Sequence, residues 1–296
     1  MVTSGRVTVA AVGAGWIPDA WETETLDAIQ FEAVLLETTD RSLEDTLRFG
    51  DVAHVPRKSN LTTQTKAAGS DVTFEQITEG DQTVTVATHE YAAVYVEDIT
   101  EAQSQISVRE SYTGGMGYTL ARGMEVSIAA LPQFYSQIVG SLGVETTEDD
   151  LLAAWRLLNQ AGVPMNERYL ALPPRAIEGL ARIDTFRNQL YGGAAGEMTR
   201  NGQMLGTIFG AQVMMSNLLR SPSAGQAEGA MYHRNQNYVI RQIKPTTVDP
   251  LHNPAGIGWQ VVMHNLYGMA EVNRPPETPG GGTAVDTWGV LIRTIA

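Results

Sequence analysis

Between residues 50 and 90 the chain carries the pattern that most constrains its fold. Valine, threonine and polar residues alternate there, as in Val72-Thr73-Phe74-Glu75 and Thr83-Val84-Thr85-Val86, and this is the period of β-strands. Residues 60–70 are almost free of large apolar side chains. The pattern predicts a long two-stranded hairpin with a polar tip. Because such a hairpin is marginal in water, it must rest on its own domain or on another copy of the chain.

Downstream of the hairpin the apolar residues change to helical spacing. The spacing predicts a long helix over residues 100–131 that Thr100 caps. Gly114, Gly115 and Gly117 lie in its middle and predict that the helix is bent or broken there, or that another segment packs very close to it.

A second helix is predicted to begin after Thr147, whose side chain caps it. Acidic residues fill its first turn, where the helix dipole favours negative charge. Gly162 and Pro164 end it. Its predicted apolar stripe consists of Leu151, Leu152, Trp155 and Leu158.

The rest of the chain predicts mainly strands. We expect a strand over residues 168–172, a helix from Pro174, and a strand over residues 204–217 in which glycines mark a bulge or a turn. Residues 192–203 and 221–229 are predicted loops. Three further strands are expected over residues 238–243, 258–267 and 284–295. Strands and helices that do not alternate regularly predict the α+β class.

Composition narrows the classes of function. Hydrophobic residues make up 43% of the 296 residues, so the chain can bury a core. A formal net charge of -13 argues against tight nucleic-acid binding, since phosphates require cationic partners. The absence of cysteine excludes disulfides and a cysteine nucleophile. No apolar run is long enough to span a membrane, so we expect no membrane partner.

No motif for catalysis or cofactor binding is present in the sequence. The five histidines form no H-E-x-x-H pair, and the sequence has neither a nucleophile elbow nor a P-loop. The paired acidic residues sit where helix caps and solvated faces are expected. We therefore assign no catalytic, cofactor-binding or metal residue, and we expect a structural protein rather than an enzyme.

In order and spacing, the elements resemble the major capsid proteins of tailed bacteriophages that share the HK97 fold. In this resemblance, residues 50–90 correspond to the extended E-loop, and the helix from Thr100 corresponds to the spine helix of the peripheral domain. The other segments that carry it are Ile17-Pro18-Asp19-Ala20-Trp21, Gly50-Asp51-Val52-Ala53-His54-Val55-Pro56, Asn166-Glu167-Arg168-Tyr169-Leu170-Ala171-Leu172-Pro173-Pro174, Gly206-Thr207-Ile208-Phe209-Gly210-Ala211-Gln212-Val213-Met214-Met215-Ser216-Asn217, and Tyr267-Gly268 followed by Val272 and Arg274.

The resemblance implies a division of the chain into parts. It implies an N-terminal arm with a short amphipathic helix from Pro18, an E-loop hairpin with flanking strands, a spine helix, a mixed α/β axial domain, and C-terminal strands that return to the peripheral domain. The implied boundaries are residues 1–45, 46–97, 98–140, 141–265 and 266–296.

It also implies which residues contact other subunits. The expected N-arm contacts are Trp16, Pro18 and Trp21, and the expected E-loop contacts are Lys58, Asn60, Lys66, Asp71 and Phe74. One subset of the family joins an E-loop lysine to an asparagine of another subunit. Lys58 and Lys66 are the two lysines that could take that part, but nothing in the sequence marks an asparagine partner or a catalytic carboxylate.

The partners that the resemblance implies are those of a phage head. Copies would form the hexamers and pentamers of an icosahedral shell, assembled in the host cytoplasm as a procapsid that expands around double-stranded DNA. An arm of about 45 residues is too short to be a fused scaffolding domain, so a separate scaffolding protein is expected. A portal is expected too, whereas a decoration protein stays an open question. Contact with the DNA would be weak and non-specific.

Three alternatives remain on the sequence alone. An encapsulin-like nanocompartment shares the fold and would enclose an enzyme instead of DNA. A tail-tube subunit would form rings or tubes. An enzyme whose site is built from dispersed residues would show a deep pocket with convergent polar groups.

Overall fold

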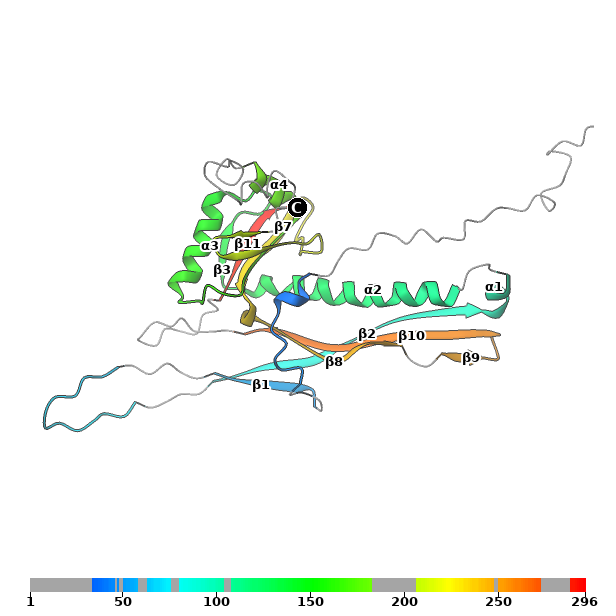
Figure 1. The fold of residues 1–296 in the computed structure, drawn as a ribbon, viewed down its shortest axis with the longest axis horizontal. Coiled ribbons are helices and arrows are strands. Elements are labelled where there is room, and N and C mark those ends of the chain that lie inside the picture. Colours follow the sequence, from blue (N-terminus) through cyan, green and yellow to red (C-terminus); the bar gives the residue numbers. More distant parts are fainter. Residues whose placement is uncertain are drawn as a thin grey trace, which may run out of the picture.

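The computed structural model describes residues 34–45, 47, 50–57, 63–75, 80–103, 108–182, 206–247, 250–272 and 288–296. These residues form an elongated molecule with two β-sheets (Figure 1). A long helix lies along the first sheet, two shorter helices pack on the second sheet, and a hairpin extends beyond one end of the molecule.

The first sheet is antiparallel and contains the predicted hairpin. Its strands lie in the order β1 (Val52–Arg57), β2 (Gly80–Glu97), β10 (Gly258–Glu271) and β8 (Asn237–Thr247), and β9 (Leu251–Asn253) also pairs with β10. In the hairpin, Val52 lies opposite Thr85 and Arg57 opposite Gly80. The hairpin is therefore confirmed at its base, whereas the strand predicted at Val72-Thr73-Phe74-Glu75 is wrong, because none of these residues is in a strand. Strand β2 continues beyond the hairpin and pairs with β10 as far as Glu97. The hairpin is thus anchored in a larger sheet at its base.

One long helix, α2 (Val108–Ala129), covers one face of this sheet, and the short helix α1 (Asp98–Gln103) precedes it. Of the three alternatives predicted for Gly114, Gly115 and Gly117, a break is wrong, because α2 runs through all three residues. Gly117 does lie close to the sheet, where an added side chain would contact Met263 of β10. Packing on the sheet offsets the low helix propensity of the three glycines. Met116 and Leu120 of the helix are buried against Val261 and Met263 of β10. Residues 104–107, between α1 and α2 in the sequence, lie outside the described part of the chain.

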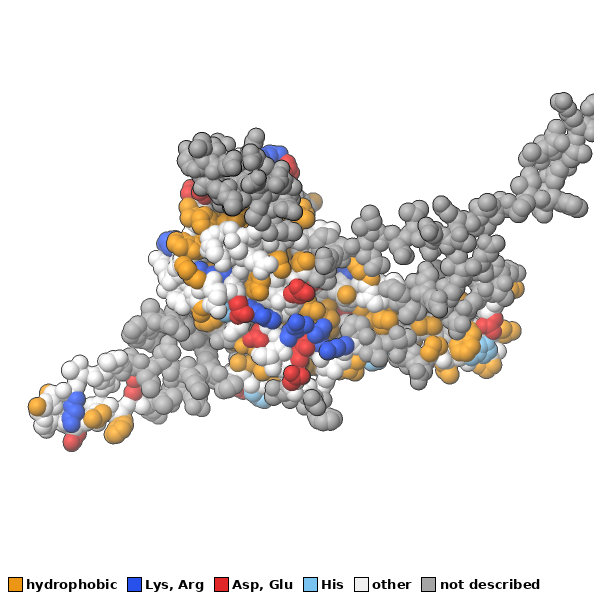
Figure 2. All heavy atoms as spheres, viewed as in Figure 1, with side chains coloured by type: hydrophobic (Ala, Val, Ile, Leu, Met, Phe, Trp, Pro, Cys, Tyr) orange, Lys and Arg blue, Asp and Glu red, His pale blue; other side chains and the backbone are white. Residues whose placement is uncertain are grey.

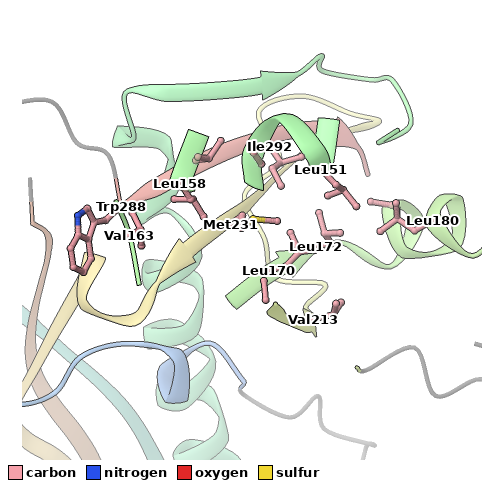
Figure 3. Packing of buried hydrophobic residues seen from close by; sticks show 14 of the residues in the cluster. Leu151, Leu158, Val163, Leu170, Leu172, Leu180, Val213, Met231, Trp288 and Ile292 are labelled. Atoms are coloured by element: carbon pink, nitrogen blue, oxygen red, sulfur yellow. The ribbon is translucent and has the colours of Figure 1, made fainter. Parts of the chain in front are cut away.

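The second sheet has six strands around the main hydrophobic core. Their order is β3 (Gln137–Gly140), β11 (Gly289–Ile295), β7 (Gln226–His233), β4 (Arg168–Leu172), β6 (Ala211–Met215) and β5 (Thr207–Ile208). The pairs β3–β11 and β4–β6 are parallel, and the others are antiparallel. Helices α3 (Glu148–Gln160) and α4 (Pro174–Ala181) cover it, and their leucines meet those of β4 in a closed cluster (Figure 3). Short 3-10 turns occupy Leu36–Thr38, Leu131–Phe134 and Arg234–Gln236.

Helix α3 begins where its cap was predicted. The Thr147 hydroxyl accepts a hydrogen bond from the Asp150 N–H at 3.3 Å, and the Asp150 carboxylate accepts one from the Thr147 N–H at 2.9 Å. These two bonds form a capping box. The predicted apolar stripe is wrong at one position, because Leu152 is exposed and Ala154 is buried in its place.

The structure refines two predictions about the second sheet. The strand predicted over residues 204–217 consists of two short strands, β5 and β6, and the turn that the glycines predicted is confirmed at Phe209-Gly210. Both turn residues have positive φ, 50° and 77°, as a two-residue hairpin turn requires. The predicted loop over residues 221–229 is wrong from Gln226 onward, where β7 begins. This strand is buried on both faces and shows no alternation, which hid it in the sequence.

The two sheets divide the chain differently from the boundaries implied by the resemblance. Strands β8 and β9 belong to the sheet of the hairpin although they precede residue 266. Strand β11 follows that residue but pairs with β3 and β7 in the second sheet. The chain therefore crosses between the sheets more than once, and the division into peripheral and axial domains stays a prediction.

Candidate assembly surfaces

The hairpin tip, residues 63–75, is the most exposed described segment. Every residue in it is exposed and none is in a strand. A turn closes it, with the Ser70 N–H and hydroxyl both donating to the Ala67 carbonyl, at 3.3 and 2.9 Å. The predicted contact residues Lys66, Asp71 and Phe74 all lie here. The other two, Lys58 and Asn60, lie outside the described residues.

Phe74 is the largest apolar side chain of the tip, and it is exposed to solvent. It is 92% exposed, and Val72 is 59% exposed. Burying a phenylalanine side chain stabilises a structure by about 1.5–3 kcal/mol relative to leaving it exposed. The chain realises none of this free energy at Phe74, so a surface that covers the tip would gain it.

The base of the hairpin is held firmly, in contrast to its tip. Ala53, Val84 and Val86 are buried in a cluster with Tyr238 and Ile240 of β8. The side-chain amide of Gln82 donates to the Glu271 carbonyl at 2.9 Å. The base of the hairpin is therefore packed and hydrogen-bonded within its own chain. Of this hairpin, the tip is the part that no other described residues cover.

A second apolar surface lies at the end of the first sheet opposite the hairpin tip, where β2 ends and β9 and α1 lie. Alternate residues of β2 face away from α2, and Tyr91 and Tyr95 are among them. Leu251 of β9 lies opposite Gln260, which lies opposite Tyr95, so all three share that face. We call the exposed side chains at this end the far-end patch: Tyr91, Tyr95, Ile99, Leu251 and Ile257, which are 42% to 73% exposed. Exposed apolar patches commonly mark interaction surfaces.

The hairpin tip and the far-end patch lie at opposite ends of the long axis (Figure 1). Figure 2 shows apolar side chains at both places, at the tip of the hairpin and over β9 and α1. One chain cannot bring the two ends together while its first sheet stays intact. Among the described residues, neither surface is therefore covered by the other end of the same chain.

A buried carboxylate fixes the point where the N-terminal segment leaves the described structure. Glu125 of α2 is 1% exposed. Its carboxylate accepts hydrogen bonds from the N–H groups of Val34 and Leu35, at 2.9 and 2.7 Å. Burial raises the pKa of Glu125 above its ordinary value of 4.5, and the backbone hydrogen bonds oppose that rise.

The same segment is held on its other side by the second sheet. The Thr38 hydroxyl lies 2.6 Å from the phenol oxygen of Tyr232 in β7, and Leu35 is buried beside Tyr232 and Tyr267. Burial raises the pKa of both tyrosines. The segment thus joins the two sheets at a fixed point. The predicted arm contacts Trp16, Pro18 and Trp21, and the helix predicted from Pro18, lie outside the described residues.

Neither the far-end patch nor the Glu125 anchor was predicted from the sequence. The patch left a weak signal, since Tyr91 and Tyr95 flank Ala93 at a spacing of two residues and therefore share one strand face with it. Glu125 left a clearer one, because it sits between the apolar positions Met124 and Ile128 of a helix. A carboxylate inside an apolar stripe indicates a buried hydrogen-bonding role.

Within the described residues, no three histidine or carboxylate side chains gather to hold a metal ion. None of the helices in the described ranges combines the length and apolar character that crossing a membrane requires.

The chain is similar to solved structures of bacteriophage particles over nearly its whole length. The structure of Mycobacterium phage Che8 matches with a TM-score of 0.77 and 19% identity, covering 94% of this chain and 97% of that chain. The capsid structure of the cyanophage P-SCSP1u matches with a TM-score of 0.75 and 16% identity, covering 99% and 96%. The mature capsid of bacteriophage PhiM1 gives 0.72 and 13%, covering 98% and 96%. The chain has the fold of a bacteriophage capsid protein.

Of the comparisons with known proteins, the comparison of structures is the one that finds matches. No protein-family model matches the chain, and no curated protein sequence matches it either. Since the matches cover nearly all of both chains, the capsid fold includes both sheets and α2 rather than one of them.

Proposed function

We propose that this chain is the major capsid protein of a tailed bacteriophage, with the HK97 fold. It would be a structural subunit, not an enzyme, of an icosahedral head that encloses double-stranded DNA. The capsid fold supports the proposal, but one observation on the chain itself carries it. Two exposed apolar surfaces, the hairpin tip and the far-end patch, lie at opposite ends of one molecule.

Surfaces at opposite ends favour closed rings of copies. A contact between different surfaces of identical subunits repeats from copy to copy, and it closes into a ring when the rotation allows. Hexamers and pentamers are such rings. In this proposal the tip, with Lys66, Asp71 and Phe74, lies on the neighbouring copy, and Lys58 and Asn60 flank the contact. The arm residues Trp16, Pro18 and Trp21 reach a further copy from the fixed point at Glu125.

The charge of the chain fits a container wall better than a DNA-binding surface. A net charge of -13 per copy repels phosphates on balance, so contact with packaged DNA is weak and non-specific. Packaged DNA then stays free to move during loading and release.

The proposed partners follow from the same assembly. A separate scaffolding protein guides a procapsid in the host cytoplasm, a portal occupies one vertex, and a decoration protein is an additional candidate. The finished subunit resides in the virion. Closed, uniform shells from this chain expressed without any other phage protein would overturn the scaffolding part of the proposal.

The shell in this proposal is held by non-covalent contacts. Lys58 and Lys66 are the residues through which a cross-link would form. Denaturing gels of mature particles should therefore show only the single chain. A ladder of covalent oligomers that disappears in a Lys58→Arg or Lys66→Arg variant would contradict this.

Negative-stain microscopy tests the function most simply. The full chain, expressed with and without the other head proteins of its source, should form hexamers, pentamers or closed shells. Rings stacked into tubes would indicate a tail-tube subunit, and shells that enclose an enzyme would indicate a nanocompartment. A chain that stays single at every concentration and salt would refute the proposal.

A further inference from the structure

Two histidines on the exposed face of the first sheet lie side by side. Nε2 of His89 in β2 and Nδ1 of His264 in β10 are 3.2 Å apart. Their rings meet edge to face, with centroids 5.2 Å apart and planes at 77°. The strand register explains the contact. Tyr91 lies opposite His264 and Leu266 opposite His89, so the two histidines are diagonal neighbours on one face.

The pair differs from the other three histidines of the chain. His54 contacts the carboxylate of Asp81 at 2.5 Å, and His252 contacts that of Asp98 at 3.0 Å. His233 is buried and packs on Trp288. By contrast, His89 and His264 contact each other, and the positions opposite them carry Tyr91 and Leu266 rather than an acid. If both rings were protonated, two cations would stand in contact without a carboxylate opposite either of them in the register.

A metal ion fits this arrangement of nitrogen atoms. Zinc binds imidazole nitrogen at about 2.0–2.1 Å in a tetrahedral arrangement, which sets two such nitrogens about 3.3 Å apart. In the metal-free chain one ring N–H donates a hydrogen bond to the other ring across this gap, and the separation of 3.2 Å is already close to that spacing. The pair needs no rearrangement of the strands, since β2 and β10 are paired in one register from Gly258 to Tyr267, on both sides of the histidines.

We propose that His89 and His264 form a two-histidine site for a divalent transition-metal ion such as Zn²⁺ or Ni²⁺. Imidazole nitrogen suits these ions. Nε2 of His89 and Nδ1 of His264 bind with their lone pairs, so each ring carries its proton on the other nitrogen. Water fills the remaining positions, because the described residues bring no third histidine or carboxylate to the pair. The site lies on the face of the sheet opposite α2 and is open to solvent.

Calorimetric titration of the unassembled full chain with Zn²⁺ alone, and separately with Ni²⁺ alone, tests the site. The chain should bind one ion. His89→Gln and His264→Gln should each weaken binding by about tenfold or more, because a second ligand already in place acts at high effective concentration. His252→Gln removes an exposed histidine with its own carboxylate partner and should leave the affinity unchanged. Binding should also weaken from about pH 7.5 to about pH 5.5, since protons compete for the nitrogens.

Thermal unfolding without metal separates loss of the site from loss of the fold. All three variants should unfold at the temperature of the unmodified chain, and added Zn²⁺ should raise that temperature in the unmodified chain and in His252→Gln only. Failure of the unmodified chain to bind either ion, or equal losses in all three variants, would overturn the proposal. The test is independent of the proposed function, because it uses the unassembled chain.

Discussion

The core of the second sheet and the hairpin tip place similar side chains in opposite environments. Leu158, between α3 and the sheet, is fully buried among other apolar residues (Figure 3). Phe74, at the tip, is 92% exposed. Burial at the first place stabilises the single chain, whereas exposure at the second stores apolar surface for a contact with another copy. Folding and assembly thus depend on different residues, and substitutions should separate them.

The largest loss of stability is expected in the core. Leu158→Ala removes a fully buried side chain and leaves a cavity, so it should lower the free energy of unfolding by about 2–5 kcal/mol. Leu152→Ala lies on the same helix but at an exposed position, and it is the matched control. Urea unfolding of both variants measures the difference. Equal losses would mean that the second sheet is not the stabilising core.

A smaller loss is expected at the anchor of the N-terminal segment. Glu125→Ala leaves the buried N–H groups of Val34 and Leu35 without their acceptor, so it should destabilise the chain by about 2–4 kcal/mol. Glu125→Gln keeps an oxygen that can accept both bonds and should lose much less. Urea unfolding checks both, and a loss in the glutamine variant as large as in the alanine variant would contradict the hydrogen-bond explanation.

The dependence of stability on pH tests whether the Glu125 carboxyl group is buried. Because burial raises the pKa of Glu125 in the folded chain above 4.5, its contribution to stability is full below the unfolded pKa and is lost as pH rises through the folded pKa. Glu125→Gln does not titrate at this position. The stability of the unmodified chain relative to that variant should therefore fall as pH rises from about 4 to about 7. A constant difference across this range would show that the carboxylate is not buried as described.

Salt should affect assembly more than folding. Copies that each carry a net charge of -13 repel one another, and raising ionic strength from about 0.01 M to about 0.15 M shortens the screening length from about 30 Å to about 8 Å. We expect light scattering of assembling material to rise over this range. Scattering that falls with salt would mean that ion pairs, rather than apolar contacts, hold the copies together.

The sequence predicted the parts of the fold that local chemistry decides. The capping residues Thr147 and Asp150 were sufficient to place the start of α3, and alternation was sufficient for the hairpin. Strand β7 was missed because both of its faces are buried and its sequence therefore shows no alternation. Glu228 and Gly229 looked like loop residues in the sequence, but they lie inside the buried strand. Glu228 is paired with Arg220, and a side chain at Gly229 would meet the Ala171 carbonyl.

The candidate surfaces were predicted only in part, for a different reason. The exposed tip followed from its composition, and Phe74 was named as a contact residue. The far-end patch depends on which face of β2 is covered by helix α2. The residues around Tyr91 and Tyr95 do not predict which face that is. The Glu125 anchor likewise depends on residues ninety positions away in the sequence.

The central claim is that the hairpin tip serves contact between copies and not the folding of one copy. The double variant Val72→Ser/Phe74→Ser removes both exposed apolar side chains of the tip, and Thr73→Ser between them is the control. Urea unfolding combined with sedimentation and negative-stain microscopy measures both properties on the same sample. We predict that the double variant unfolds within about 0.5 kcal/mol of the unmodified chain, yet stays unassembled when it is expressed with the other head proteins of its source, where Thr73→Ser forms shells. A double variant that assembles as readily as the control, or that fails to fold, would contradict the account.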